Sequence, residues 1–198
     1  MDLKQFFECR LLSESEQINR SVELKKTFVV IPSLNQYELI DYTLSNIISK
    51  GICEMCEILL VDDRSSDDYL RLIRKYGVVS YVRIDNGRGF NFSMICNIAA
   101  KVVHQLGGEE FLLWNNDLWV DSIAFLETLL RKHRADRATI SGTKLLYPEK
   151  PVSLGLHEQV IDLKHLGTVQ FGGSYWVRNS GGPLALSPIH FKRFASRE

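Results

Sequence analysis

Short apolar runs alternate with segments of helical periodicity from Thr27 onward, and this alternation constrains the fold more than any other feature of the sequence. Residues 27–32 and 57–62 are almost continuously apolar, as strands buried on both faces are. Between them, residues 37–50 place their apolar side chains on one helical face, and Gly51 follows as a stop signal. The alternation predicts an α/β fold with a doubly wound, mostly parallel sheet and helices on both of its faces.

The same pattern continues along the chain to about residue 141. Further strands are expected over residues 78–84, 111–114 and 138–141, and further helices from the polar stretch 65–68 to residue 76, over 92–106 and over 123–130. Beyond residue 148 only loops and short strands are expected, followed by a last helix over 188–194. Residues 1–26 are polar and charge-mixed, so we expect a helical arm there and one domain over residues 27–198.

Composition and charge exclude several classes of protein. Lysine and arginine total 24, and aspartate and glutamate also total 24, which argues against a nucleic-acid-binding protein because such proteins need a basic surface. No apolar run approaches the ~20 residues that span a bilayer, and charges interrupt the N-terminal apolar residues that a signal peptide would need. We therefore expect a cytoplasmic protein. An alternative for residues 1–26 is peripheral contact with a membrane surface or a partner protein.

The four cysteines are expected to be reduced thiols in that compartment. Cys53 and Cys56 form a CxxC pair, but the chain has no second pair to complete a tetrahedral zinc site. A redox pair would open a helix after a strand, whereas this one directly precedes an expected strand. Neither metal binding nor redox chemistry is assigned to these thiols.

Polar residues follow four consecutive expected strands, at the point where each strand ends. The four stretches are Pro32–Asn35, Asp62–Ser66, Asp85–Gly89 and Asn115–Asp117. Such residues are ordinary in turns, and any one stretch alone is explained by turn chemistry. Ligands of open α/β sheets bind at the carboxyl ends of the strands, so four polar stretches in phase favour a polar ligand there, with a cation as a further option.

These stretches also carry a resemblance to the family 2 glycosyltransferases, whose domain has the GT-A nucleotide-sugar fold. The matching segments run in order from about Thr27 to Pro148 and are Val30–Asn35, Leu60–Asp67, Asn86, Gly89–Ser93, Asn97, Phe111–Asp117 and Gly142–Pro148. Each motif is degenerate by itself, but their order and spacing together are fairly specific. The resemblance thins to Gly181–Leu184 afterwards and implies a GT-A-like domain over residues 27–198.

The resemblance implies roles for particular residues. Asp63 matches the family carboxylate that accepts hydrogen bonds from the nucleobase, and the stretch from Ser33 to Asn35 would lie beneath the nucleoside. Leu34 stands where the family often has an aromatic residue, so only apolar contact with the base is expected. The implied donor-binding residues are Pro32, Ser33, Leu34, Asn35, Asp63, Arg88, Gly89 and Asn116.

A divalent cation, Mn²⁺ or Mg²⁺, is the implied cofactor. Asn115–Asp117 occupies the family's D-x-D position, and only Asp117 keeps a carboxylate there. One carboxylate suffices in principle, because Mg²⁺ is commonly held by one or two carboxylates together with substrate phosphates and water. Bound in this way, the cation would neutralise the departing nucleoside diphosphate. Of the tryptophans beside this motif, Trp114 is expected in the core, and Trp119 is a candidate for a wall of the sugar site.

The implied function is the transfer of a sugar from a UDP-, dTDP- or GDP-linked donor to a glycan or lipid-linked acceptor, with inversion, in polysaccharide assembly. An inverting enzyme needs an Asp or Glu as general base. None of Glu158, Asp162 and Glu198 matches the family's acidic segment, so we expect this chain to lack the acceptor and base segment. The catalytic base is therefore unassigned. The alternative is a catalytically incomplete domain that binds a nucleotide-sugar or acts as a scaffold.

Two other nucleotide-binding classes fit the sequence less well. A sugar-phosphate nucleotidyltransferase would carry a glycine-rich, basic loop after the first strand, but residues 33–36 contain neither glycine nor a cation. A dinucleotide-binding fingerprint would require a third glycine where Phe92 stands, and Gly87 and Gly89 follow the third expected strand rather than the first.

Overall fold

The computed structural model describes residues 25–84, 89–137, 140–143 and 145–146, together with the backbone of the strands 169–171, 176–178 and 184–186. The chain divides into two compact units, Met1–Ile123 and Ala124–Glu198. Expectations for residues 1–24 and 188–194, among them the two terminal helices, lie outside the described residues.

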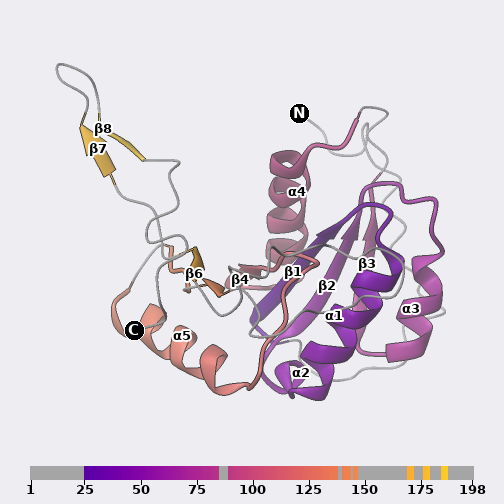
Figure 1. Cartoon of the computed structure of the whole chain (residues 1–198), viewed down its shortest axis with the longest axis horizontal. Helices are drawn as coiled ribbons and strands as arrows, with labels where there is room; N and C mark the ends of the chain where they lie inside the picture. Colours follow the sequence, from indigo (N-terminus) through magenta and orange to yellow (C-terminus); the bar gives the residue numbers. More distant parts are fainter. Residues whose placement is uncertain are drawn as a thin grey trace. The chain divides into compact units, whose positions relative to one another are not determined.

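The first unit is built on a sheet of four parallel strands (Figure 1). These strands are β1 (Thr27–Ser33), β2 (Glu57–Asp62), β3 (Val79–Arg83) and β4 (Glu110–Leu113). Their spatial order is β3-β2-β1-β4, so the chain proceeds from β1 to β3 on one side and then returns to pair β4 with the other side of β1. The direction of winding therefore reverses at β1, and in open α/β sheets this switch point is where ligands bind.

Every residue of β1 and β2 is buried, because helices cover both faces of the sheet. On one face, Phe28 and Val30 of β1 and Leu59 of β2 pack in a cluster with the apolar side of α4 (Phe92–Gln105). The opposite face carries α1 (Tyr37–Ser49) and α3 (Tyr69–Tyr76), which contact each other (Figure 1). The doubly wound, parallel α/β architecture predicted from the sequence is confirmed.

Glycines end α1 and α4 as the sequence predicts. Gly51 follows α1 with φ of +76°, and Gly107 follows α4 with φ of +83°, a region that glycine enters without steric cost. The short helix α2 (Ile52–Met55), which the sequence analysis did not predict, then contains Cys53 and leads to the buried Cys56. Among the described residues, no helix is both long enough and apolar enough to cross a bilayer.

The second unit differs from the expectation at residues 138–141. Its helix α5 (Ala124–Ala135) is longer than predicted, and Ile140 and Ser141 lie outside any strand. Ile140 is 88% exposed, so this β-branched residue is not drawn into a sheet by burial. The strands of this unit are short antiparallel pairs, β5 (Leu145–Leu146) with β6 (Val169–Phe171) and β7 (Trp176–Arg178) with β8 (Leu184–Leu186).

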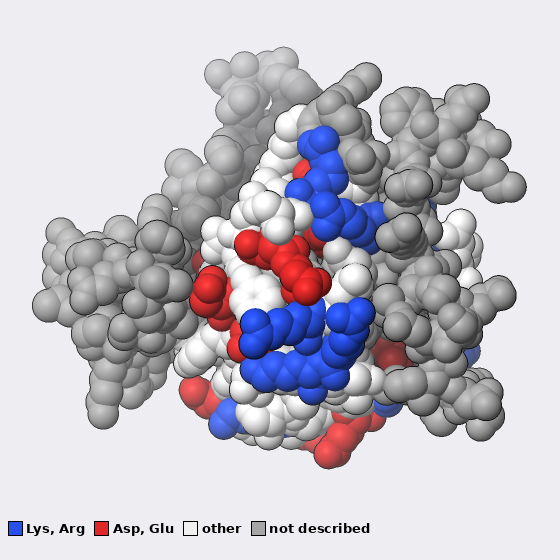
Figure 2. Space-filling model, turned by 90° about the vertical axis from the view of Figure 1, so that its right-hand side faces the viewer, with Lys and Arg blue, Asp and Glu red and all other residues white. Residues whose placement is uncertain are grey.

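A charged contact joins α1 to α3 on the outside of the first unit. Asp41 accepts hydrogen bonds from the Lys75 ammonium at 2.6 Å and from the Tyr76 hydroxyl at 2.5 Å. Burial alone would raise the pKa of Asp41, but the hydrogen bonds from Lys75 and Tyr76 outweigh it and hold that pKa below its usual value. Figure 2 views the side of the molecule on which α3 lies and shows acidic and basic side chains beside each other there.

We predict that Asp41→Asn lowers the free energy of unfolding at pH 7. A carboxyl group whose pKa is depressed by folding contributes stability above its unfolded pKa of about 3.9 and loses it as the pH falls through the folded value. The difference from the wild type should therefore shrink on acidification, and urea unfolding at about pH 7 and about pH 2.5 measures it. Asp121→Asn, at an exposed position, is the control. A difference of equal size at both pH values would contradict this assignment.

Candidate functional site

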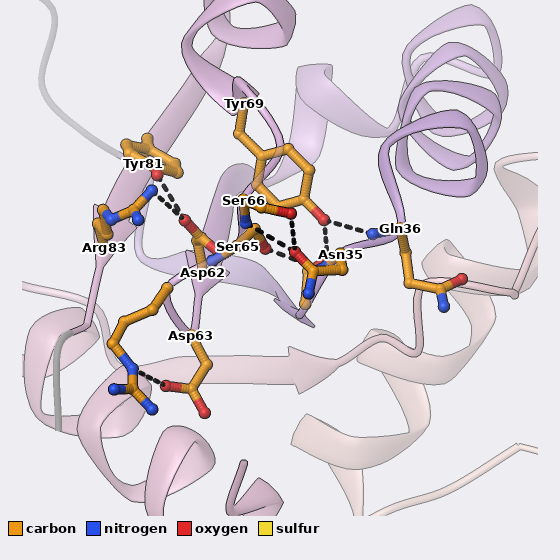
Figure 3. Close-up of polar contacts among 11 residues, drawn as sticks. Asn35, Gln36, Asp62, Asp63, Ser65, Ser66, Tyr69, Tyr81 and Arg83 are labelled. Carbon is orange, nitrogen blue, oxygen red and sulfur yellow. Dashed lines mark hydrogen bonds and ion pairs between the residues drawn. The ribbon is translucent and has the colours of Figure 1, made fainter. Parts of the chain in front are cut away.

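Asp62, the last residue of β2, is the centre of a buried polar network. It is 0% exposed, and its carboxylate accepts hydrogen bonds from the Tyr81 hydroxyl at 2.7 Å, from Arg83 Nη1 at 3.3 Å and from the Ser65 backbone N–H at 2.8 Å (Figure 3). Burial, reinforced by the bond to Asp62, raises the pKa of Tyr81, so its hydroxyl stays protonated and donates. The three donors offset the cost of burying the charge and fix the turn that follows β2.

Asn35 joins the loop after β1 to the turn after β2. Its backbone N–H donates to Ser65 Oγ at 2.8 Å, and its side-chain oxygen accepts from the backbone N–H and the hydroxyl of Ser66 at 2.7 and 3.0 Å (Figure 3). Asn35 and Arg64 both adopt positive φ, +49° and +56°, which costs energy for residues other than glycine. The polar contacts between the two loops offset this strain.

Tyr69, the first residue of α3, adds a second connection between the same loops. Its hydroxyl pairs with Ser33 Oγ at 2.7 Å and accepts from the backbone N–H of Gln36 at 2.9 Å (Figure 3). The next backbone N–H, that of Tyr37, donates to Asp67 Oδ2 at 3.3 Å. The N-terminus of α1 is therefore capped by residues that follow β2. We call residues 33–37 and 62–69, which these contacts join, the paired loops.

Asp63 continues the pairing of β2 with β1 by one residue. Its backbone N–H donates to the Ser33 carbonyl at 2.9 Å, and the residue is 2% exposed. Its carboxylate Oδ1 lies 3.7 Å from Arg64 Nε. Figure 3 shows the Asp63 side chain pointing away from the network around Asp62, as the alternation of side chains along a strand requires. A carboxylate is thus held next to the end of β1 with its charge partly balanced.

The stretch Asn115–Asp117 leaves the sheet on the other side of β1. The last hydrogen bond between β4 and β1 runs from the Trp114 backbone N–H to the Val30 carbonyl at 2.9 Å. Asn115 and Asp117 are then exposed and Asn116 is half-buried. β2 and β4 each lie one strand spacing from β1, so their ends are roughly 10 Å apart across the sheet. Along the strands β4 ends three residues earlier, because Leu113 pairs with Val30 whereas Asp62 pairs with Ser33. Asp63 and Asp117 therefore follow strands that flank β1 and end at the same edge of the sheet.

The other residues singled out in the sequence have varied positions. Pro32 and Ser33 are buried at the carboxyl end of β1, Leu34 is half-buried, and Gly89 is exposed. Arg88, with the rest of 85–88, lies outside the described residues. The side chain of Asn91 caps α4 by accepting from the Met94 backbone N–H at 2.9 Å, so its place in the motif has a structural explanation. Trp114 is buried as expected, and Trp119 is half-buried.

Oxygen ligands for a cation are available on the stretch after β4, but they do not form a complete set. Within the described ranges, no group of three or more His, Cys, Asp or Glu residues is placed to hold a metal ion. Asp117 offers one carboxylate, and Asn115 and Asn116 offer amide oxygens, a donor type that suits Mg²⁺ and Mn²⁺. These residues fit a divalent cation that completes its coordination with phosphate oxygens and water.

Sequence reasoning missed the residues that hold the paired loops in place. Tyr69 and Tyr81 look like ordinary core aromatics in the sequence, and their hydroxyl partners lie 36 and 19 residues away. Residues 65–68 are predicted to cap α3, yet the N-cap Asp68 makes no side-chain capping bond, and Asp67 caps α1 instead. One signal was available, namely that four polar residues before one helix exceed what capping needs.

Comparison with known proteins gives a family match and one curated relative. The model of the family described as "Glycosyl transferase family 2" matches residues 28–178. The O-antigen biosynthesis protein RfbC of Myxococcus xanthus is 26% identical over 161 residues, a stretch that covers 81% of this chain and 12% of that protein. The chain therefore spans about an eighth of the length of this relative.

Two solved structures are similar over about two thirds of the chain. One is the mannosyltransferase PcManGT from Pyrobaculum calidifontis in complex with GDP-Man and Mn²⁺, with a TM-score of 0.48 and 18% identity over 66% of this chain and 37% of that one. The other is S. aureus TarS 1–349 in complex with UDP-GlcNAc, with a TM-score of 0.47 and 22% identity over 65% and 35% of the two chains.

We predict that Tyr69→Phe destabilises the protein by about 1–3 kcal/mol, because it leaves the buried hydroxyl of Ser33 and the part-buried backbone N–H of Gln36 without their partner. Tyr42→Phe removes the hydroxyl of a tyrosine that is 41% exposed and should change stability by less than about 0.5 kcal/mol. Urea unfolding of both variants at neutral pH makes the measurement. Equal stabilities would show that the Tyr69 hydroxyl does not hold the paired loops.

Proposed function

The chain belongs to glycosyl transferase family 2, and from this premise we propose that it binds a nucleotide-diphospho-sugar and transfers the sugar to a glycan or lipid-linked acceptor. The observation that carries the proposal is the placement of Asp63 and of Asn115–Asp117 just after β2 and β4, the two strands that flank β1 at the switch point of the sheet. A nucleoside diphosphate would span this edge, with its base beside the residues after β2 and its phosphates beside those after β4.

The paired loops are the proposed nucleoside side of this site. Asp63 would accept hydrogen bonds from N–H groups of the base, since a carboxylate offers two acceptor oxygens to an imide or amide. Leu34, half-buried between Ser33 and Asn35, would make apolar contact with the nucleoside. Pro32, buried at the end of β1, would support this stretch from below. The contacts around Asp62 and Tyr69 supply the rigidity that a binding loop needs.

The stretch after β4 is the proposed phosphate side. Asp117 would bind Mn²⁺ or Mg²⁺, and Asn116 would help to orient the donor. A cation bound there supplies charge neutralisation for the leaving diphosphate. Arg88 and Gly89, in the loop after β3, are proposed to contact the phosphates, since a guanidinium recognises phosphate oxygens in a bidentate manner.

Inverting transfer further requires a general base for the acceptor hydroxyl. In the part of this edge that the structure describes, the Asp62 carboxylate already accepts three hydrogen bonds within the protein. Asp63 and Asp117 are assigned to binding the nucleotide-sugar. The carboxylates of Glu158, Asp162 and Glu198, none of which matches the family's acidic segment, lie outside the described residues. The alternative function is a domain that binds the nucleotide-sugar without transferring it. Turnover of a UDP-, dTDP- or GDP-linked sugar by the full chain separates the two functions.

The proposed setting is polysaccharide assembly at the cytoplasmic side of a membrane. The name of the Myxococcus xanthus relative, an O-antigen biosynthesis protein, supports this setting. Residues 1–26 are the proposed point of contact with the membrane or a partner, and residues 27–198 the proposed glycosyltransferase domain.

We predict that Asp63→Ala weakens the binding of free nucleoside diphosphate roughly tenfold to a hundredfold in the absence of metal. The estimate follows from the loss of hydrogen bonds to a charged group, each worth about 1.5–3 kcal/mol. Thermal-shift screening against UDP, GDP and dTDP, with and without Mn²⁺, selects the nucleotide, and calorimetry measures its affinity. Asp68→Ala, at an exposed position of the same loop, is the matched control and should bind normally. Equal affinities would remove Asp63 from base recognition.

We predict that Asp117→Ala abolishes the increase in nucleotide affinity that Mn²⁺ produces and leaves metal-free binding unchanged. The residue is exposed on a loop, so the fold should persist, which circular dichroism checks. Asp121→Ala, another exposed carboxylate four residues further on, serves as the comparison and should keep the full Mn²⁺ effect. A variant at position 117 that still responds to Mn²⁺ like the wild type would refute the metal role.

A further inference from the structure

We propose that Thr43 and Asn46 of α1 are positioning residues that hold the segment Asn115–Val120 and thereby set the cation affinity of Asp117. The inference rests on the proposed function, because it takes Asp117 as the cation ligand. It adds two residues from a helix that no motif of the sequence analysis includes. We call Asn115–Val120 the β4 loop.

Thr43 holds the β4 loop directly beside Asp117. Its hydroxyl donates to the backbone carbonyl of Asn116 at 2.6 Å, and Thr43 is 0% exposed. Shielding from water makes such a hydrogen bond electrostatically stronger than one at the surface. The carbonyl that it holds belongs to the peptide bond between Asn116 and Asp117. The position of the Asp117 main chain is therefore tied to α1.

Asn46, one turn further along α1, holds the far end of the β4 loop. Its side-chain amide donates to the Val120 carbonyl at 3.0 Å, and its side-chain oxygen accepts from the Val120 N–H at 2.8 Å. Both backbone groups of one residue are thus bound by one side chain, in the way a neighbouring strand would bind them. An amide is the side chain that does this, since it carries a donor and an acceptor together.

Aromatic residues close the β4 loop between these two points. Trp114 Nε1 donates to the Leu118 carbonyl at 3.0 Å, which folds the loop back on its own start. The Trp119 ring meets the Tyr42 ring of α1 edge to face, with 5.7 Å between the ring centres. The loop backbone is therefore bound at residues 116, 118 and 120, while the side chains of Asn115 and Asp117 stay exposed.

The physical consequence concerns the entropy of cation binding. An exposed carboxylate on an unheld loop must lose backbone freedom when it binds a cation, and that loss weakens the affinity. The β4 loop is instead bound to a helix whose Leu44 and Ile47 are 0% exposed and which is packed on the sheet. Removing the bonds from α1 should therefore weaken cation binding without touching Asp117 itself.

Paired substitutions at Thr43 separate positioning from stability. Thr43→Val keeps the volume and removes the hydroxyl, whereas Thr43→Ser keeps the hydroxyl and removes a buried methyl group. Asn46→Ala removes both bonds to Val120, and Ser45→Ala alters an exposed residue of the same helix as a control. For each full-length variant, calorimetry measures the affinity for Mn²⁺ in the presence of the best-binding of UDP, GDP and dTDP. The affinity for that nucleotide without metal and the melting temperature are measured in parallel.

Thr43→Val and Asn46→Ala should each weaken the affinity for Mn²⁺ by about threefold to tenfold, the effect of losing one or two hydrogen bonds. Thr43→Ser and Ser45→Ala should bind Mn²⁺ like the wild type, and all four should bind the nucleotide normally without metal. If Thr43→Ser loses Mn²⁺ affinity in step with its melting temperature, the role of Thr43 is only structural and the inference is wrong.

The variant Asp117→Ala, measured in the same series, distinguishes the two levels of failure. If it loses the Mn²⁺ effect while Thr43→Val and Asn46→Ala keep it, the positioning inference falls and the proposed function stands. If it keeps the Mn²⁺ effect, or if the wild type binds none of the three nucleotides, the proposed function falls and takes the inference with it.

Discussion

The buried carboxylate of Asp62 is the interaction on which the candidate site depends. A charge with no exposure to solvent is tolerable only when donors surround it, and here they come from β3 and from the turn after β2. By fixing that turn, Asp62 places the next residue, Asp63, against the end of β1. The two adjacent aspartates thus differ in role. Asp62 stabilises the turn after β2, and Asp63 is the residue proposed to bind the ligand.

Within the first unit, two separate sets of contacts hold the two halves of the proposed site. The paired loops hold Asp63 through contacts between the β1 and β2 connections, and Tyr69 links them. The β4 loop holds Asp117 through contacts with α1. The helix α1 takes part in both, because the paired loops cap its N-terminus and its second and third turns bind the β4 loop. Family membership and this geometry together support a glycosyltransferase domain.

The sequence predicted the sheet well because burial on both faces leaves a clear signal. Residues 57–62 form β2 at the predicted bounds, and helices α1 and α4 end within a residue of the predicted positions. The strand predicted over 138–141 was wrong at Ile140 and Ser141, since a β-branched residue indicates a strand only where something buries it. The edge on which Asp63 and Asp117 lie followed from strand polarity. Their supports did not, because Thr43 and Asn46 act across 73 and 74 residues and make no local pattern.

The strand order has a consequence for how this domain assembles. β4 joins β1 across 83 residues of chain, whereas β1, β2 and β3 pair with their neighbours in sequence. Contacts between distant segments carry the largest loop-closure cost and slow folding the most. The half of the edge that carries Asp63 can therefore form from the first three strands, while the half that carries Asp117 exists only after β4 has docked. If Asp117 binds a cation as proposed, the affinity for that cation would report that the last strand of the sheet is in place.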